Sequence, residues 1–237
     1  MSHFRSLLFY FFFLTGTILF FSFFSPVKFF SYKVTVRLSR FWSKSVIYLA
    51  KYILNIDYRV SGLKNLPKDK NFLIVSNHQS AWETVFFSYY FSCPVFILKE
   101  ELRKIPIFSW YFDKLGFIYI NRQDKFSSLK HVVKSINFLI SSGRKSFVIF
   151  PEGTRVEPNK KVELNLGFFA IHKMTGLPIL PLVHNSGVFW KNKKFNKTRG
   201  DINIKILPMI KDLGNKSLAK KTIEDIFNIN DQNSSQP

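Results

Sequence analysis

The sequence predicts an α/β protein with a mostly parallel sheet flanked by helices and an N-terminal helical membrane anchor. Three observations lead to this fold class. Short runs rich in Ile, Val and Phe alternate with helix-length segments through most of the chain. A long apolar segment without charges stands near the N-terminus. The composition is 46% hydrophobic, which is enough to build a packed core.

The candidate strands are short and are bounded by Asn, Gly, Pro or charged residues. They are Phe72–Ser76, Pro94–Leu98, Phe117–Ile120, Ser146–Phe150, Ile179–Val183 and Ile202–Ile206. The helices expected between them are Trp82–Phe91, Pro106–Leu115, Ser127–Ser142 and Leu166–Thr175. Together these elements define one domain over residues 57–227. The polar segment 228–237 is expected to be a flexible tail.

Residues 1–56 form the expected anchor. Leu7–Phe24 contains no charge and would span about 27 Å as a helix, close to the thickness of the hydrocarbon core of a bilayer. A cleaved signal peptide has a shorter apolar core and ends at a small-residue cleavage site, whereas this segment ends in Phe23–Pro26. We therefore expect the segment to stay attached to the protein.

A second helix is expected over residues 32–56. This segment mixes cations with apolar residues, which is typical of a basic amphipathic helix on a membrane surface. A helix packed on the soluble domain, with its basic face in solvent, is the alternative. The cations that follow the apolar segment favour a cytoplasmic location for the rest of the chain. They are Lys28, Lys33, Arg37, Arg40, Lys44 and Lys51.

The charge balance predicts an anionic partner. The chain has 35 Lys and Arg against 15 Asp and Glu, a formal net charge of +20. Nucleic acid, anionic lipid or a phosphorylated substrate would all satisfy such an excess. We find no zinc-finger spacing, helix-turn-helix signal or Gly-aromatic RNA-binding signature, so nucleic acid is not expected. The basic loop, Lys191–Arg199 (KNKKFNKTR), suits a headgroup surface and equally suits an ordinary solvated loop.

Metal and disulfide chemistry find little support in the sequence. A single cysteine, Cys93, excludes an internal disulfide and a cysteine-based zinc cluster. The five histidines are scattered along the chain and form no recognisable set of metal ligands. Surface positions or hydrogen-bonded core positions are the simpler interpretation of most of them.

The segment Asn77–Thr84 (NHQSAWET) carries a candidate catalytic pair. It lies where a predicted strand ends and a helix begins, a position at which α/β domains bind ligands. His78 could take a proton from an alcohol while Glu83 holds the imidazole tautomer and stabilises the imidazolium. Glu83 also has the spacing of a capping box with Ser80, so a purely structural role is the alternative.

The segment Phe150–Arg155 (FPEGTR) also follows a predicted strand. Gly153 permits a turn that presents backbone N–H groups, and Arg155 supplies a guanidinium that suits a phosphate. By itself, this segment is equally consistent with an ordinary β-turn carrying an exposed arginine.

Two more segments complete a recognisable set. Gly116–Arg122 (GFIYINR) is a strand that delivers its arginine to the same edge of the sheet, and Leu177–Val183 (LPILPLV) is a strand bracketed by prolines. In this order, the four segments resemble the glycerolipid acyltransferase family that contains bacterial 1-acylglycerol-3-phosphate acyltransferases. The signatures of that family are N-H-x-x-x-x-D, G-x-x-F-I-x-R, F-P-E-G-T-R and a proline-rich strand. The resemblance covers about residues 60–210.

The resemblance implies a role for each matching residue. His78 corresponds to the general base of the family and Glu83 to the acid that orients it. The positions that match those associated with the phosphate of the acyl acceptor are Lys99, Arg122 and Arg155. The positions in the motif that shapes the acceptor pocket are Glu152, Gly153 and Thr154.

The chain departs from the family pattern at two positions. Glu83 stands where most relatives have Asp, which lengthens the side chain and keeps its charge. Asn165 stands where relatives often have Lys, two residues before the matching Gly167. Loss of that cation would weaken phosphate binding or indicate a different acceptor.

The function implied by the resemblance is acyl transfer from acyl-CoA or acyl carrier protein to 1-acyl-sn-glycerol-3-phosphate (lysophosphatidic acid), which gives phosphatidic acid. No metal or cofactor is required. The expected setting is the cytoplasmic side of a bacterial inner membrane, in contact with its phospholipids. One alternative is the same chemistry on glycerol-3-phosphate or on a lyso-aminolipid such as lyso-ornithine lipid. A more distant one is a basic binding protein tethered to the membrane.

Overall fold

The computed structural model describes residues 2–121 and 124–234. Its centre is a seven-stranded sheet in the order β1-β7-β6-β2-β5-β3-β4. All neighbouring strands are parallel except β6 and β7, which confirms the predicted mostly parallel sheet. The strands are β1 (Ile56–Ser61), β2 (Phe72–Ser76), β3 (Val95–Lys99), β4 (Ile118–Ile120), β5 (Ser146–Ile149), β6 (Ile179–His184) and β7 (Gly200–Ile206).

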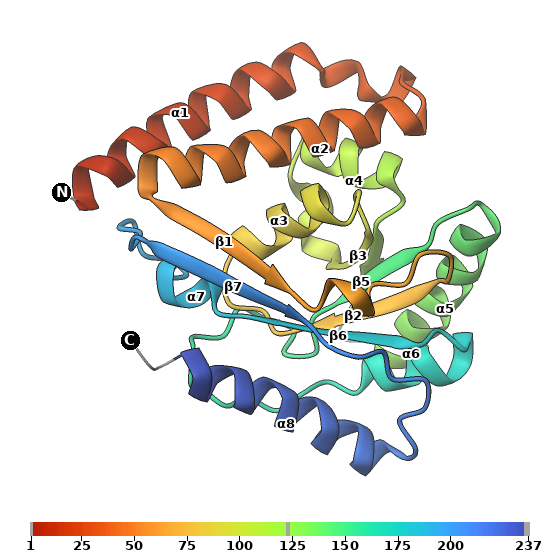
Figure 1. Ribbon diagram of the computed structural model, residues 1–237. Helices are drawn as coiled ribbons and strands as arrows, with labels where there is room; N and C mark the ends of the chain where they lie inside the picture. Colours follow the sequence, from red (N-terminus) through yellow and green to blue (C-terminus); the bar gives the residue numbers. More distant parts are fainter. Residues whose placement is uncertain (1, 122–123, 235–237) are drawn as a thin grey trace.

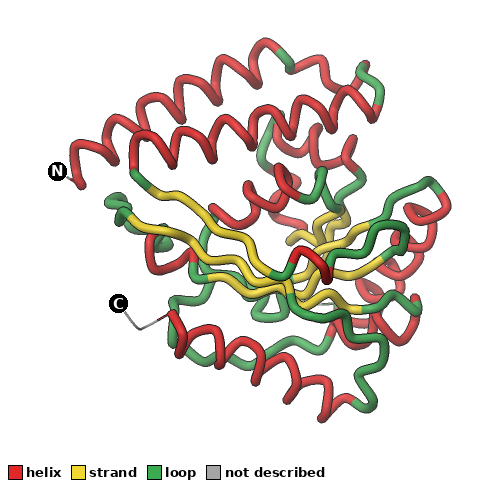
Figure 2. The backbone as a smooth tube through the Cα atoms, in the orientation of Figure 1, coloured by secondary structure: helices red, strands yellow, loops and turns green. Residues whose placement is uncertain are grey.

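Helices cover both faces of this sheet (Figure 1). The long helices α1 and α2 lie side by side on one face with α3 and α4, and α5, α6 and α8 cover the other face (Figure 2). The helices are α1 (Ser2–Phe23), α2 (Tyr32–Leu49), α3 (Trp82–Tyr90), α4 (Phe108–Leu115), α5 (Lys125–Ser141), α6 (Gly167–Thr175), α7 (Ser186–Phe189) and α8 (Lys216–Ser234). Shorter helical turns are η1 (Ser25–Phe29), η2 (Ala50–Leu54), η3 (Leu63–Asn65) and η4 (Glu100–Lys104).

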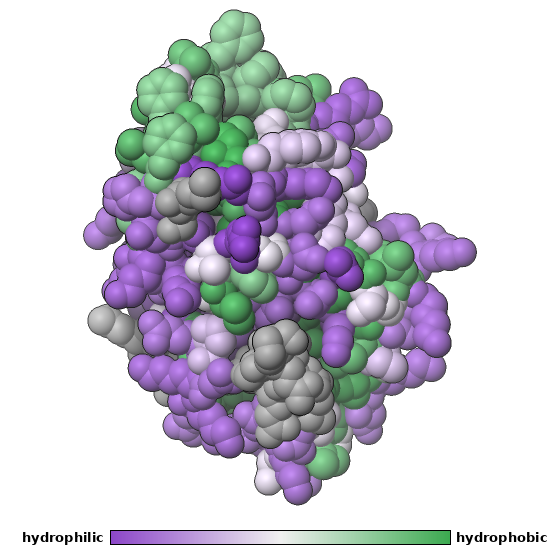
Figure 3. Space-filling view, turned by 60° about the vertical axis from the view of Figure 1, so that its left-hand side comes forward, coloured by the Kyte–Doolittle hydropathy of each residue, from purple (hydrophilic) through white to green (hydrophobic). Residues whose placement is uncertain are grey.

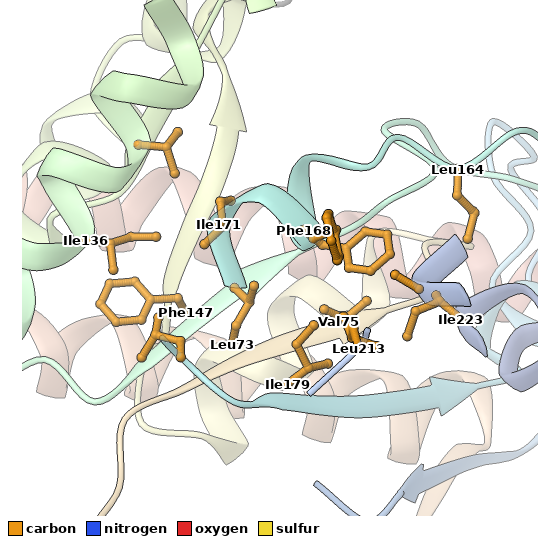
Figure 4. Packing of buried hydrophobic residues seen from close by; sticks show 14 of the residues in the cluster. Leu73, Val75, Ile136, Phe147, Leu164, Phe168, Ile171, Ile179, Leu213 and Ile223 are labelled. Carbon is orange, nitrogen blue, oxygen red and sulfur yellow. The ribbon is translucent and has the colours of Figure 1, made fainter. Parts of the chain in front are cut away.

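Strand β2 shows how the core is divided between the two faces. All five of its residues are buried, as expected of a central strand that is covered on both sides. Because side chains alternate along a strand, Leu73 and Val75 pack with Phe147 of β5 toward α5, α6 and α8 (Figure 4). Phe72 and Ile74 point the other way, into the cluster that contains parts of α1, α2 and α3.

The six predicted strands and the four helices predicted between them are present, with ends that differ by at most two residues. The apolar helix expected over Leu7–Phe24 begins five residues earlier, because α1 extends over Ser2–Phe23. The amphipathic helix expected over residues 32–56 is shorter than predicted, because α2 and η2 end at Leu54. Asn55 then takes a left-handed conformation with φ 55°, and Ile56 begins β1. Helix α8 was not predicted, and it continues to Ser234, into the segment expected to be a flexible tail. Residues 235–237 lie outside the described residues.

Helix α1 has two different faces. Its inner face packs on the domain: Phe9 and Phe21 are buried, and the Thr17 hydroxyl accepts a hydrogen bond of 3.2 Å from the Trp42 indole of α2. By length and composition, His3–Phe23 is also the one helix among the described residues that could cross a membrane. Apolar side chains gather over the outer face at the upper end of the molecule (Figure 3). Its exposed residues include Phe4, Leu7, Phe11, Ile18, Leu19 and Phe23.

Replacing Phe147 with alanine should lower the free energy of unfolding by about 3–5 kcal/mol, because it leaves a cavity against Leu73 and Ile136 in a fully buried cluster. Urea unfolding in a mild detergent would measure the loss. The matched control is Phe138→Ala on α5, where the side chain is 68% exposed and the expected change is within about 0.5 kcal/mol. Equal losses for the two variants would contradict the packing described here.

Candidate active site

His78 and Glu83 form an ion-pair-like contact at the carboxyl end of β2. His78 lies in the turn that follows this strand, and Glu83 is in the first turn of α3. The Nδ1 atom of His78 is 2.7 Å from Oε1 of Glu83. The turn therefore brings together the two residues that the H-x-x-x-x-E spacing proposed as a pair.

The Glu83 carboxylate is fully buried and heavily hydrogen-bonded. It accepts the backbone N–H groups of Gln79 at 2.9 Å and Ser80 at 2.9 and 3.0 Å, and the hydroxyls of Ser80 and Ser186, the latter at 2.8 Å. Burial by itself raises the pKa of Glu83. His184, His78 and Ser80 lower it by more, so the pKa lies below the ordinary value of 4.5. Glu83 is therefore ionised at neutral pH.

The predicted capping box is present in altered form. Helix α3 begins at Trp82 and its N-cap position is Ala81, not Ser80 as expected. The Ser80 hydroxyl nevertheless accepts the Trp82 N–H at 3.1 Å, and the Glu83 carboxylate accepts the Ser80 N–H. Glu83 therefore caps its own helix and contacts His78 at the same time, so the structural and the functional interpretation are compatible.

Contacts on three sides hold the His78 ring and backbone. The ring stacks on Phe150 at a centroid distance of 4.1 Å and an angle of 17°. The backbone N–H of His78 donates to the Glu152 carboxylate, and its carbonyl accepts the Val156 N–H at 2.8 Å. The Phe150–Arg155 segment therefore lies directly against His78.

His184 and Ser186 are site residues that sequence reasoning missed. His184 is fully buried, and its Nε2 lies 2.9 Å from the Asn77 carbonyl, while its backbone exchanges two hydrogen bonds with the Asn77 amide side chain. Burial lowers the pKa of His184, which keeps it neutral at neutral pH, although Glu83 opposes this shift. His184 is the last residue of β6, the neighbour of β2, and Ser186 begins α7 directly after it. This shared sheet edge was the signal that could have found them.

Arg155 lines a cavity of about 420 Å³, whose described lining does not include His78 or Glu83. The cavity lies between α1 and the basic loop, and Ala81, three residues after His78, is also in its wall. The lining residues are Tyr10, Ala81, Arg155, Trp190, Lys191, Asn192, Lys193, Lys194, Phe195 and Lys197. The cavity is therefore strongly basic, with aromatic rings on part of its wall.

Comparison with known proteins shows the family of the chain. The family model described as Acyltransferase matches residues 57–185, which include His78, Glu83 and Arg155. The chain belongs to the acyltransferase family. The matched region extends from β1 through β6 and into the turn before Ser186, so it contains most of the hydrogen-bonded site.

Individual relatives carry more specific names. A 1-acyl-sn-glycerol-3-phosphate acyltransferase of Pseudomonas aeruginosa is 36% identical over 70% of this chain and 64% of its own length. The enzyme of the same name from Borreliella burgdorferi is 32% identical over 81% of this chain and 76% of its own length. The crystal structure of the 1-acyl-sn-glycerophosphate acyltransferase of Thermotoga maritima matches the fold with a TM-score of 0.81, 24% identity and coverage of 100% and 99%.

The remaining residues predicted to act in the site lie on the turn after β5 and at the end of β3. Gly153 has φ +67° and donates its N–H to the Phe150 carbonyl, forming the predicted turn, and Thr154 is exposed beside it. Lys99 is exposed at the end of β3, with β5 between its strand and β2. Arg122 lies outside the described residues. The structure therefore places Glu152 and Arg155 near His78, and Lys99 at the far side of the site.

Asn165, the departure from the family pattern, has a structural role. Its side-chain oxygen accepts the Gly167 N–H at 2.8 Å at the start of α6, and its backbone N–H donates to the Pro151 carbonyl at 2.8 Å. The residue thus connects the start of α6 to the FPEGTR turn.

In the described part of the chain there is no cluster of three His, Cys, Asp or Glu residues that could hold a metal ion.

Replacing Glu83 with glutamine should destabilise the fold in a pH-dependent way. The ionised carboxylate contributes stability that is complete above about pH 4.5 and is lost as the pH falls toward its lower folded-state pKa. Glu83→Gln should therefore cost on the order of 2–3 kcal/mol at pH 7, as lost charge-assisted hydrogen bonds, and progressively less below pH 4.5. Urea unfolding of both proteins from pH 3 to 7 would measure the difference. A constant difference would contradict the buried anion.

Proposed function

We propose that the protein transfers an acyl group from acyl-CoA or acyl carrier protein to the free hydroxyl of 1-acyl-sn-glycerol-3-phosphate, producing phosphatidic acid for phospholipid synthesis. The observation that carries the proposal is the 2.7 Å contact between His78 and a buried, ionised Glu83. A basic cavity lined by Arg155 and by Ala81, three residues after His78, supports it. The names of the relatives support the choice of acceptor.

The proposed mechanism is direct transfer with His78 as general base. Because Glu83 is an anion that can only accept hydrogen bonds, it holds the imidazole proton on Nδ1 and leaves the lone pair on Nε2. Nε2 removes the proton of the acceptor hydroxyl as its oxygen attacks the thioester carbonyl. When the carbon–sulfur bond breaks, the imidazolium returns this proton to the leaving thiolate. Glu83 stabilises the imidazolium between these two steps.

The phosphate of the acceptor is the proposed ligand of Arg155. This arginine is exposed to the cavity and follows the turn that contacts the His78 backbone. A guanidinium can bind a phosphate through two parallel hydrogen bonds, which fixes orientation as well as adding affinity. Lys99 and Arg122 remain predicted phosphate contacts. Lys99 of β3 lies opposite Ile120, the last residue of β4, and Arg122 follows two residues later in the sequence.

The proposed location is the cytoplasmic face of a bacterial inner membrane, with α1 lying in the interface. The inner face of α1 contacts the domain along most of its length, from Ser6 near the basic loop to Phe21 near Tyr111 of α4. Crossing the bilayer would separate these contacts, whereas lying in the interface buries only the outer apolar face. The cations of α2 then face anionic headgroups.

Replacing His78 with alanine should lower kcat by about 10²–10⁴-fold, because the reaction loses its general base. A labelled acyl thioester and lysophosphatidate in lipid vesicles would measure the loss. His131→Ala, at an exposed position on α5, is the matched control and should keep full activity. A folded His78→Ala protein with wild-type turnover would refute the mechanism, and no transfer by the wild type to any acceptor would favour a binding protein.

The same assay identifies the acceptor when glycerol-3-phosphate and lyso-ornithine lipid are supplied in parallel. We expect product from lysophosphatidate alone. Product from lyso-ornithine lipid instead would retain the mechanism and change the substrate, and would connect that change to Asn165, which occupies the position of the usual lysine with a neutral capping residue. Asn165→Lys would then be expected to restore phosphate preference.

Placing charges on the outer face of α1 should release the protein from membranes. Phe11→Lys combined with Ile18→Lys removes two side chains that are 61% and 65% exposed. Each loses roughly 1.5–3 kcal/mol of apolar burial in lipid, so the partition coefficient should fall by more than tenfold. Flotation with anionic vesicles would measure it. Phe138→Lys, at an equally exposed phenylalanine of α5, should bind like the wild type, and unchanged binding of the double variant would refute this placement.

A further inference from the structure

Lys197, in the basic loop, is an unusually buried cation. Only 5% of the residue is exposed. Its ammonium donates hydrogen bonds to the carbonyl oxygens of Lys191 at 3.1 Å and Lys194 at 2.5 Å. It also lies 5.3 Å from the centre of the Trp190 ring and 5.9 Å from that of Tyr10. An ordinary lysine of a solvated loop would instead keep its charge in water.

The loop around Lys197 is fixed to helix α1. The Lys197 backbone N–H donates to the Ser6 hydroxyl at 3.0 Å, and both residues are buried. Phe195 stacks on Tyr10 with ring centres 5.0 Å apart, and the Thr198 N–H donates to the Phe189 carbonyl at 2.9 Å. These contacts hold Lys197 in the wall of the cavity that Ala81 and Arg155 also line.

The charge of Lys197 is not balanced inside this cavity. Its lining contains Arg155 and four lysines, and no Asp or Glu. No ion pair in the described part of the chain involves Lys197 or Arg155. Burial, together with nearby Arg155, lowers the pKa of Lys197 to about 8. Burying one cation next to another is unfavourable unless an anion accompanies them.

We propose that Lys197 and Arg155 together bind the phosphate of the acceptor lipid. This inference rests on the proposed function. The cavity wall includes Tyr10 of α1, whose outer face is the proposed membrane surface, so a headgroup can enter while its acyl chain stays in lipid. The cavity is connected to His78 through its neighbours, because Ala81 is three residues after His78 and Arg155 precedes Val156, whose N–H donates to the His78 carbonyl.

Replacing Lys197 with methionine should raise the KM for lysophosphatidate by about 10–100-fold, the equivalent of one charge-assisted hydrogen bond. The kcat and the KM for acyl-CoA should change by less than about twofold. Lys197→Arg should keep most of the acceptor affinity, and Lys221→Met, at an exposed position of α8, is the matched control. All four proteins are assayed in vesicles of the same composition.

Two outcomes would overturn the proposal. An unchanged KM for lysophosphatidate in folded Lys197→Met protein excludes Lys197 as a phosphate ligand. A raised KM for acyl-CoA with an unchanged acceptor KM assigns the cavity to the phosphates of the donor. Either result leaves the proposed function intact as long as the wild type forms phosphatidic acid, so the failure of one proposal is distinguishable from the failure of the other.

A binding experiment tests the site without turnover. Calorimetry with His78→Ala protein should detect 1-hexanoyl-glycerol-3-phosphate and not 1-hexanoylglycerol, and the added Lys197→Met change should weaken binding of the phosphorylated ligand by about 10–100-fold. Equal binding of the phosphorylated ligand with and without Lys197 would refute the proposal.

A pH profile keeps the proposal testable if Lys197→Met does not fold. The wild-type KM for lysophosphatidate should rise above about pH 8, as Lys197 loses its proton, while that of Lys197→Arg stays constant to about pH 9.5. The other ionisable groups of the cavity are the same in both proteins: Tyr10, Arg155, Lys191, Lys193 and Lys194. Identical profiles for the two proteins would contradict a protonated Lys197 at the phosphate.

Discussion

The buried carboxylate of Glu83 is the interaction on which the candidate site depends. It accepts hydrogen bonds from backbone N–H groups of the turn after β2 and from His78. It also accepts the hydroxyls of Ser80, just before α3, and Ser186, just after β6. An anion in such a place is stable only when nearly every lone pair is occupied. The turn, the start of α3 and the end of β6 must therefore take one arrangement together, and that arrangement also fixes the tautomer of His78.

The parallel part of the sheet explains why these groups meet at all. Strands β2, β5 and β6 run in the same direction, so their carboxyl ends bring three loops to one edge. The loop after β5 carries the FPEGTR turn, whose Glu152 and Phe150 contact His78. The loop after β6 contributes Ser186 and continues through α7 to the basic loop. Chemistry is concentrated where strands end, and the strands themselves supply rigidity.

Sequence reasoning was effective wherever the relevant interaction was local. Short runs rich in Ile, Val and Phe located six strands, and the five-residue spacing of His78 and Glu83 predicted the contact between these two candidate catalytic residues. Ser186, His184 and Lys197 were not predicted, because their partners Glu83, Asn77 and Ser6 are more than one hundred residues away and no local pattern encodes such contacts. The hydrogen-bond acceptor of Trp42, Thr17 on α1, was hidden within an apolar run for the same reason.

Tyr10 belongs at once to α1 and to the wall of the cavity. A ligand that contacts this wall stabilises the packing of α1 on the domain. Displacing α1 would weaken binding of the ligand by the same free energy, because coupling between two equilibria is reciprocal. If α1 lies in the membrane surface and the cavity binds the headgroup, as proposed above, the two events are coupled through α1. On these proposals, a protein detached from lipid would lose affinity for its acceptor, and α1 would respond to the membrane as well as anchor the protein to it.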